Sequence, residues 1–379
     1  MRLLIFTDSP TLPTSYANVG RYFADAVSQL GVEVAFGSLQ HSGNVLTYEY
    51  NGRTYQHFGC APTHRIPVAI RDYNPDVIMH IRDPVALSPK LYHPQSYSIK
   101  AHARGRPVIQ WVPVQHELLP YEYVEVLHRE SDLTLVFTKA GVARLGNAGH
   151  VRDRMDYLPI GVSPAYSDPE GAEAHGYGRV GIPIVMSVGL GNQDRKAFPV
   201  LMRAYREALS SDPTLDLDFY LHTTPAGAFD LVEHTKMLGV QGHWMFPRAH
   251  DPGIGNTEAE LAMRYRRALA YVSCSTGEGF NMPLSEAAAL GRVMIHPRTP
   301  NETEVLEDYE GPKLSYGTHP IPRANNWEWL PDPEDLAVQL LKLRELKTDP
   351  AAGRRYYERH AWPRVAERFM GLVKDRGWK

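Results

Sequence analysis

SCSTGEGFNMPLSEAAALGRVMIHPRTPNETE, residues 273–304, is the stretch that decides the fold predicted for this chain. In order, it predicts a strand tail over 271–274, a loop over 277–281, a helix over 285–290 and a buried strand over 293–295. The loop contains two glycines and an asparagine, which permit a positive φ and a close approach of the backbone. Pro283 suits the first position of the helix, and Gly291 suits its end. The stretch therefore predicts a strand–loop–helix–strand unit.

The loop and the helix start of this unit predict an anion site. Free N–H groups of the loop and of the first helical turn converge with the positive end of the helix dipole. Two carboxylates flank this place, Glu278 in the loop and Glu286 in the helix. A carboxylate repels a phosphate, but it accepts hydrogen bonds from pairs of neutral hydroxyls. A nucleotide sugar, with a diphosphate in its middle and sugar hydroxyls at each end, fits both features.

Residues 278–286, EGFNMPLSE, look like the Glu-x7-Glu signature of retaining GT-B glycosyltransferases, those of glycosyltransferase family four. The resemblance implies that Glu278 contacts the transferred sugar and that Glu286 holds the ribose hydroxyls. The residues between them are then expected to bind the donor: Gly279, Phe280, Asn281, Met282, Pro283 and Leu284. Asn281 stands where the family usually has glycine, and asparagine tolerates the left-handed conformation well enough to keep the turn. The alternative is an ordinary strand–loop–helix unit with solvated glutamates.

A group of polar residues follows the predicted strand 183–188. Its loop contains Gly191 and Asn192, then Arg195 and Lys196, directly before a predicted helix. Two adjacent cations at a helix start are unfavourable for the dipole, so we expect an anion to compensate them. The resemblance implies that Arg195 and Lys196 act on the pyrophosphate, although the family's arginine lies earlier in the loop, and we expect Gly191 and Asn192 to bind the donor. The alternative is a flexible, solvated pair of cations.

The Asp-Leu-Asp run at 216–218 is similar to the metal-binding DxD of the other large glycosyltransferase fold. Here both aspartates alternate with leucine in a strand-like run, so we expect them on the exposed face of a strand. We therefore predict no metal ligand. Arg195, Lys196 and the loop amides would supply the positive charge that a metal supplies elsewhere, and no cofactor is expected besides the donor substrate.

The N-terminal half predicts a second parallel α/β domain. Strands are predicted at 2–6, 32–36, 76–81, 106–112 and 132–138, and helices at 16–30 and from residue 140. A strand–helix–strand order implies a parallel sheet with its loops at the carboxyl edge. His116, after the strand 106–112, is a candidate catalytic residue because the resemblance places a histidine near the transferred sugar; a surface histidine is the alternative. Thr14-Ser15 replace a common glycine pair of the family, which favours a lining role toward the acceptor.

These patterns predict an α/β protein of the GT-B type, in which two Rossmann-like parallel-sheet domains face each other across a cleft. We expect an acceptor-side domain at 1–170 and a nucleotide-sugar-binding domain at 180–355. Residues 163–183, rich in Pro, Gly and Ala, are the predicted linker. Residues 356–379 resemble the family's terminal helix, which returns to the first domain.

The composition is that of a globular protein. The 379 residues are enough for two domains, with 43% hydrophobic and 22% charged residues. The net charge of −3 gives no global attraction to nucleic acid or to anionic membranes. No apolar run approaches ~18 residues, so no membrane span is predicted. Two distant cysteines, Cys60 and Cys274, favour a reducing compartment, and we expect a cytoplasmic protein.

The sequence thus predicts a glycosyltransferase that moves a hexosyl or pentosyl group, with retention by analogy to the family. The acceptor is open between a small molecule, a glycan and a modified base in DNA, for which Arg144, Arg152 and Arg154 would be the place of contact. A non-catalytic nucleotide-sugar-binding protein is an alternative, because the first loop is altered. A sugar-nucleotide epimerase is a third. The oligomeric state is left open.

Overall fold

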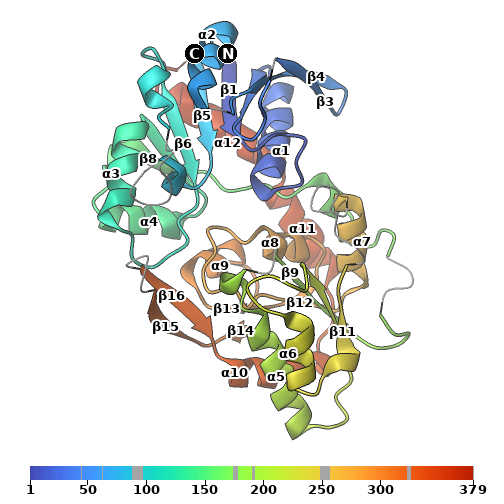
Figure 1. The fold of residues 1–379 in the computed structure, drawn as a ribbon. Helices are drawn as coiled ribbons and strands as arrows, with labels where there is room; N and C mark the ends of the chain where they lie inside the picture. The colour runs from blue at the N-terminus through green and yellow to red at the C-terminus, as the bar shows by residue number, and fades with distance from the viewer. Residues whose placement is uncertain are drawn as a thin grey trace. The chain divides into compact units, whose positions relative to one another are not determined.

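The computed structural model describes residues 1–43, 45–61, 63–87, 97–173, 178–189, 193–247, 257–321 and 326–378. The chain divides into two compact units (Figure 1). The first consists mainly of Met1–Gly161 and His360–Lys379, and the second mainly of Val162–Pro322 and Trp327–Arg359. Each unit has a parallel sheet of its own. No helix in these described ranges is long and apolar enough to cross a membrane.

The first unit is built on an eight-stranded sheet. In chain order the strands are β1 (Arg2–Thr7), β2 (Glu33–Ser38), β3 (Leu46–Tyr50), β4 (Arg53–Gly59), β5 (Val77–Ile81), β6 (Val108–Val112), β7 (Leu133–Val136) and β8 (Met155–Tyr157). They lie in the order β3-β4-β2-β1-β5-β6-β7-β8, and every pair is parallel except β3–β4. In the register, Leu4 lies between Ala35 and Ile78. Strands β5, β6 and β7 are buried throughout, as expected for a parallel sheet that is covered on both faces.

Helices cover the sheet of the first unit. They are α1 (Ser15–Gln29), α2 (Ile66–Tyr73), α3 (Tyr121–Glu130), α4 (Lys139–Asn147) and α12 (Trp362–Asp375). The last of these comes from the far end of the chain and lies beside α1 (Figure 1). The ring of Phe369 meets that of Phe23 edge-on with centroids 5.0 Å apart, and Trp362 stacks on Tyr22 at 6.0 Å. Aromatic packing therefore ties the C-terminal helix to the first unit.

The second unit has a six-stranded parallel sheet and a separate hairpin. The strands are β9 (Ile184–Val188), β10 (Asp218–His222), β11 (Trp244–Met245), β12 (Ala270–Val272), β13 (Val293–Pro297) and β14 (Lys313–Leu314), with the hairpin β15 (Tyr316–Ile321) and β16 (Asn326–Pro331). The sheet order is β11-β10-β9-β12-β13-β14. The chain builds outward from β9 to one edge and then from β12 to the other. Ligands of such sheets bind beyond the carboxyl ends of the strands at this reversal, here between β9 and β12.

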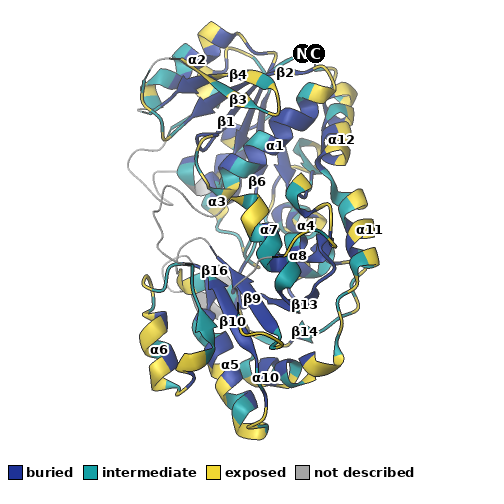
Figure 2. Ribbon diagram, turned by 90° about the vertical axis from the view of Figure 1, so that its right-hand side faces the viewer, coloured by how far each residue is buried: buried dark blue, intermediate teal, exposed yellow. Residues whose placement is uncertain are grey.

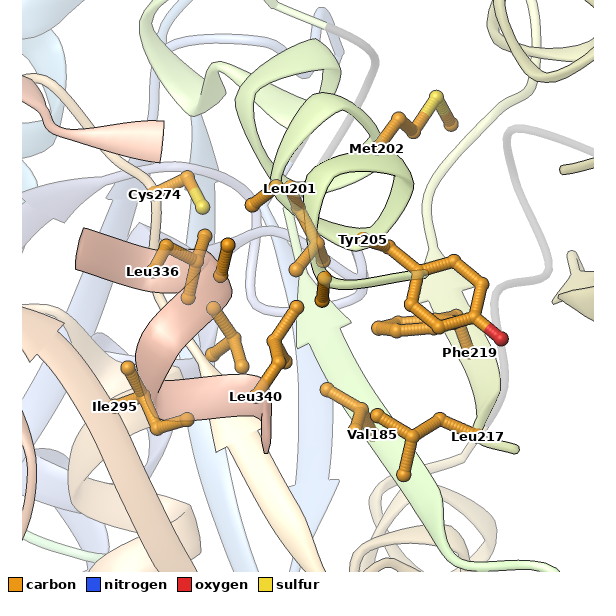
Figure 3. Packing of buried hydrophobic residues seen from close by; sticks show 14 of the residues in the cluster. Val185, Leu201, Met202, Tyr205, Leu217, Phe219, Cys274, Ile295, Leu336 and Leu340 are labelled. Atoms are coloured by element: carbon orange, nitrogen blue, oxygen red, sulfur yellow. The ribbon is translucent and has the colours of Figure 1, made fainter. Parts of the chain in front are cut away.

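Helices also cover the second sheet. They are α5 (Phe198–Ser211), α6 (Leu231–Met237), α7 (Glu258–Arg267), α8 (Met282–Ala289), α9 (Pro300–Val305), α10 (Pro333–Lys342) and α11 (Pro350–His360). Leu201 of α5 and Leu336 and Leu340 of α10 pack over Val185 and Ile295 of the sheet, and all five are fully buried (Figure 3). Figure 2 shows the result as dark blue strands beneath helices whose outer faces are yellow. The apolar stripes of these helices thus provide the core.

The structure confirms the predicted α/β class with two Rossmann-like sheets, and it differs from the sequence prediction in several details. Helix α8 begins at Met282, before the predicted start, because the Asn281 side chain caps it by accepting from the Leu284 amide at 3.3 Å. Among the described residues of the loop 277–281, only Asn281 has a positive φ, at 65°, so the glycines are not needed for that conformation. Strands β3, β4, β8, β14, β15 and β16 were not predicted.

The stretch predicted as a linker, 163–183, also differs. Its first residues belong to the second unit and are packed there, with Ser163 at 7% and Tyr166 at 0% exposure. Tyr166 ends a short 3-10 helix, Pro164–Tyr166. A composition rich in Pro, Gly and Ala indicates irregular backbone, but it does not show whether that backbone is packed.

Candidate functional site

Two loops of the second unit meet where its strand order reverses. One follows β9 and ends in the 3-10 turn Asp194–Lys196, and the other follows β12. The Arg195 carbonyl accepts hydrogen bonds from the Thr276 amide at 2.8 Å and from the Ser275 hydroxyl at 3.2 Å. The Thr276 carbonyl in turn accepts from the amide of Trp329 in β16 at 2.9 Å. The backbone therefore fixes both loops against each other, as the prediction of a shared site requires.

Glu278 is paired with both of the predicted cations. Its Oε1 accepts from Arg195 Nη1 at 2.9 Å, from Lys196 Nζ at 2.5 Å and from the hydroxyl of Ser275 at 2.8 Å. The side chain of Glu278 is 10% exposed and that of Lys196 is 9% exposed, whereas that of Arg195 is 34% exposed. Charge-assisted hydrogen bonds in this largely buried environment hold the three side chains in one geometry. Lys196 is therefore not solvated, whereas Arg195 keeps about a third of its side chain exposed while it pairs with Glu278.

The pairing changes the acidity of these groups. Burial would raise the pKa of Glu278, but the positive charges of Arg195 and Lys196 outweigh burial and lower the pKa to about 2. Burial lowers the pKa of the Lys196 ammonium, and the Glu278 charge acts in the opposite direction. With both cations charged and Glu278 ionised, the group has one positive charge in excess. This excess is suited to an anion.

A glycine gives Lys196 the room that it needs. A Cβ at Gly189 would lie 3.0 Å from Lys196 Cγ and 3.1 Å from its Cδ, so the lysine would have to shift by a few tenths of an ångström to make room for it. The stem of the lysine therefore passes directly over the backbone at the end of β9. Ala197, the next residue after Lys196, is left-handed with φ 45° and ψ 36°. Such backbone is strained in a residue other than glycine, and it lies beside the cation pair.

The start of α8 is held by buried polar groups. Asn281 Nδ2 donates to Ser273 Oγ at 3.0 Å and to Glu302 Oε1 at 2.6 Å. Burial and the charge of Glu278 raise the pKa of Glu302 to about 7, although the hydrogen bonds that Glu302 accepts lower it. The Asn301 side chain donates to the Glu278 carbonyl at 2.6 Å. The Asn281 side chain thus anchors the loop.

The backbone amides of the loop divide into two sets. The amides of Leu284 and Ser285 donate to the Asn281 carbonyl at 3.0 and 3.2 Å. If Leu284 contacts the donor substrate as predicted, the contact would therefore not be made by its amide. The amides of Gly279, Phe280 and Met282 donate to no acceptor in the described part of the chain. Pro283, one residue into α8, has no amide hydrogen to offer. The unused amides lie at the positive end of the α8 dipole.

Glu286 lies in α8, in a largely buried place. Its Oε2 is buried and has no hydrogen-bond partner among the described residues. Burial, and then the negative charge of Glu258, raise the pKa of Glu286 to about 8. A carboxyl with an unused buried oxygen has capacity left for the hydroxyls of a ligand.

The aspartates of the DxD-like run have another partner. Asp218 and Asp216 both bind Arg179, with closest distances of 2.6 Å in each pair. Asp216 is 44% exposed as predicted, but the prediction is wrong for Asp218, whose side chain is 4% exposed. The guanidinium makes this burial possible because it donates to the Asp218 carboxylate and neutralises it, and the two acids raise the pKa of Arg179.

The remaining candidates lie elsewhere. His116 is half-buried in the loop after β6, in the first unit, so its role in transfer remains a prediction. Gly191 and Asn192 lie outside the described residues. Of the basic residues considered for DNA, Arg144 donates to the Val114 carbonyl at 3.2 Å and Arg154 to the His128 carbonyl at 3.1 Å. These contacts use both arginines to hold the backbone of the first unit.

Sequence reasoning missed several residues of this site. They are Gly189, Ser275, Asn301, Glu302 and, beside Glu286, Tyr166. One signal was present: Thr299 and Glu302 have the spacing of a capping box, and Thr299 does cap α9 by accepting from the Glu302 amide at 3.3 Å. The others share no spacing with Glu278 or Glu286, so only the fold reveals them.

No family model and no curated protein matches the chain. Solved structures do match over its whole length. A sucrose-phosphate synthase from Thermosynechococcus elongatus is 14% identical with a TM-score of 0.72, over 99% of this chain and 98% of that one. The trehalose-6-phosphate synthase OtsA is 11% identical with a TM-score of 0.69, over 99% of each chain. A pneumococcal O-GlcNAc transferase, GtfA, solved with UDP and GlcNAc, is 10% identical with a TM-score of 0.68, over 99% of each chain. The chain therefore has the fold of the GT-B glycosyltransferases.

Proposed function

We propose that this protein is a glycosyltransferase that moves a sugar from a nucleotide-diphosphate sugar to an acceptor, with retention of configuration and without a bound metal ion. The proposal is carried by the group of Arg195, Lys196 and Glu278 at the strand-order reversal of the second unit. Proteins of the same fold support it, since one was solved with UDP and GlcNAc and another with UDP-2-fluoro glucose.

The two cations would act on the leaving group. Negative charge grows on the diphosphate as its bond to the sugar breaks, and donors that are already in place stabilise that charge best. Arg195 and Lys196 are held by Glu278 before any ligand arrives, so little reorganisation is needed. The unused amides of Phe280 and Met282 would add two further donors at the α8 dipole.

The two carboxylates would bind hydroxyls. A pKa of about 2 keeps Glu278 ionised at any physiological pH, so it can accept hydrogen bonds from the hydroxyls of the transferred sugar. Glu286 would accept from the ribose of the nucleotide through its carboxylate. Retention would follow from attack on the face from which the diphosphate departs, because the acceptor proton can then pass to the leaving phosphate.

The acceptor would be a small molecule, a glycan or a modified base in DNA. The contacts of Arg144 and Arg154 with backbone carbonyls give the DNA acceptor no particular support. We also propose a reducing, cytoplasmic location, because Cys60 and Cys274 are buried, unpaired thiols.

A ligand screen tests the function. Thermal unfolding is followed with UDP-, GDP-, ADP- and TDP-sugars, and the matching donor is expected to raise the midpoint by mass action, by about 2.7 kcal/mol of stability at a hundredfold excess over Kd. The same donor is then incubated with the protein in EDTA, and free sugar and nucleoside diphosphate are measured. Slow release of both supports a transferase. Binding without any release would favour the non-catalytic binding protein, and the absence of any shift would contradict the proposal.

A further inference from the structure

Glu286 is surrounded by aromatic hydroxyls that the proposed mechanism does not use. Tyr166 and Tyr265 both interact with its carboxyl, and both tyrosines are fully buried. Their rings meet edge-on with centroids 5.8 Å apart. The Tyr166 hydroxyl and Glu286 Oε2 are each buried without a partner at hydrogen-bond geometry in the ranges that the structure describes. An unused donor thus lies beside an unused acceptor.

The two tyrosines are not equivalent. The Tyr265 hydroxyl donates its one proton to the Pro283 carbonyl at 3.2 Å, at the start of α8. In this geometry its proton is directed at the helix start and not at Glu286. The Tyr166 hydroxyl retains its proton, and leaving a buried donor unpaired costs about 1–3 kcal/mol. Tyr166 is consequently the tyrosine that can donate to the Glu286 carboxylate.

The segment that carries Tyr166 is fixed at both ends by α7. The Ser163 hydroxyl donates to Glu258 Oε2 at 2.9 Å. Arg266 donates to the carbonyl of Ala165 at 3.0 Å and to that of Asp168 at 2.7 Å. These bonds hold the tyrosine in one place relative to α7, and Tyr265 of the same helix holds the start of α8. The distance between Tyr166 and Glu286 is thereby set by the fold.

We propose that Tyr166 is a positioning residue of the donor site: in the donor-bound protein its hydroxyl donates to Glu286 Oε2 and holds the carboxylate for two adjacent ribose hydroxyls. This inference rests on the proposed function. A carboxylate that accepts from one fixed donor has fewer orientations, and its remaining lone pairs point in defined directions. Tyr166 would act through Glu286 and would not itself touch the sugar.

The charges around Glu286 make the effect dependent on pH. Glu258 and Tyr265 of α7 and Tyr166 of the 3-10 helix all interact with the Glu286 carboxyl. Tyr271 of β12 also interacts with it electrostatically. Burial raises the pKa of Tyr166, and the positive charge of Arg266 acts on Tyr166 in the opposite direction. Burial and Glu258 favour the neutral carboxyl, whereas a hydrogen bond donated by Tyr166 would favour the ionised form. Binding a vicinal diol also favours the ionised form. Loss of the Tyr166 hydroxyl should therefore weaken binding most where Glu286 is mainly protonated.

The test measures nucleotide binding by calorimetry in wild type, Tyr166→Phe, Glu286→Gln and the double variant. The probe is the nucleoside diphosphate (UDP, GDP, ADP or TDP) that raises the wild-type midpoint most. Tyr166→Phe is expected to raise Kd about five- to tenfold at pH 7 and less than about twofold at pH 9, where Glu286 ionises in either protein. In the Glu286→Gln background the same substitution is expected to have no effect.

Tyr356→Phe is the matched control. Its hydroxyl donates to the Val305 carbonyl at 3.0 Å and lies 3.0 Å from Ser285 Oγ, on the same helix α8, so it tests general loosening of that helix. It should leave the pH profile of Kd unchanged. The inference would be overturned if the Kd of Tyr166→Phe had the wild-type pH profile, or if Tyr166→Phe weakened binding equally in the Glu286→Gln background. The proposed function would stand in either case. A folded wild type that binds none of the four nucleotides would overturn both.

Discussion

The two units have the same kind of strand-order reversal, and different side chains gather there. In the first unit the reversal lies between β1 and β5, where Asp8 pairs with Arg82 at 3.5 Å. Asp8 also accepts from the hydroxyl of Thr14 at 2.6 Å and from the side-chain amide of Gln40. In the second unit the reversal lies between β9 and β12, where one carboxylate, that of Glu278, pairs with two cations.

The comparison separates what the fold provides from what the side chains provide. Parallel topology gives each unit a place for a ligand at the carboxyl edge of its sheet. The charge at that place is balanced in the Asp8–Arg82 pair, whereas the group at Glu278 has a positive charge in excess and unused amides nearby. The diphosphate of a donor therefore matches the second unit.

The largest expected difference between the units is in their response to acid. Burial is the main cause that lowers the pKa of His57, His80 and His150 of the first unit to about 4, and of His296 of the second unit likewise. A histidine whose folded pKa lies below its unfolded value stabilises the protein above about pH 6.5, and this stability is lost as the pH falls toward 4. Each buried histidine can contribute up to about 3 kcal/mol.

Hydrogen exchange followed in individual peptides at pH 9, 7, 5.5 and 4.5 tests this difference. We expect protection to fall earlier in the peptides of the first unit, which contains three of these four histidines. On the alkaline side the order reverses, because the raised pKa values of Glu286 and Glu302, about 8 and 7, give stability that is lost as the pH rises from about 4.5 through those values. If protection from exchange were lost equally in both units at both low and high pH, the two units would not differ in their response to pH.

Next in size is the effect of removing one cation from each reversal. Lys196→Ala is expected to lower donor turnover by at least ~10²-fold, which is about 2.7 kcal/mol of barrier, while the protein stays folded. Arg82→Ala, in the other unit, should leave the affinity for the nucleoside diphosphate unchanged. Steady-state kinetics and calorimetry on both variants give the answer. Near-normal turnover in Lys196→Ala would show that the positive excess at Glu278 has no part in transfer.

A smaller effect on turnover is expected from adding a side-chain carbon at Gly189, next to the Lys196 stem. In Gly189→Ala the added Cβ meets the lysine stem at 3.0 Å, so the stem must shift by a few tenths of an ångström. We expect this shift to lengthen the Lys196–Glu278 contact and to lower turnover roughly tenfold. Gly371→Ala is the matched control, because nothing lies within 4 Å of its Cβ and it lies inside α12. This control should leave turnover intact and raise stability by about 0.5–1 kcal/mol. Equal turnover in both variants would mean that Lys196 adjusts freely.

The smallest effect is expected at Ala197. Its left-handed backbone, with φ 45°, is strained for alanine and is readily adopted by glycine. Ala197→Gly is therefore expected to raise the free energy of unfolding by up to about 1 kcal/mol, measured by urea denaturation. The same variant should lower turnover slightly, since the backbone beside Lys196 becomes less rigid. A loss of stability would show that the conformation is not strained.

Local pattern was sufficient for most of the secondary structure. The continuous apolar runs predicted β1, β5 and β9, and Gly291 follows the end of α8 as predicted, with φ 65°. The structure adds that Thr14, predicted only to line the acceptor side, caps α1. The edge hairpin β3–β4 was missed because its outer strand is largely exposed and carries no apolar run. Tyr166 was missed because a Pro- and Gly-rich composition gives no signal for burial.

The sequence by itself determined the α/β class and the presence of Lys196 and Glu278 in two loops that follow strands, since strand and helix periodicity and loop composition are local properties. The tertiary structure decided that these side chains, 82 positions apart, form one ion pair, and that Asp218 is neutralised by Arg179. It also decided which amides of the α8 start remain unused and which hydroxyl lies beside Glu286. The reason is physical: strand order and burial set those distances and desolvate those charges, and both arise only when the whole sheet is assembled.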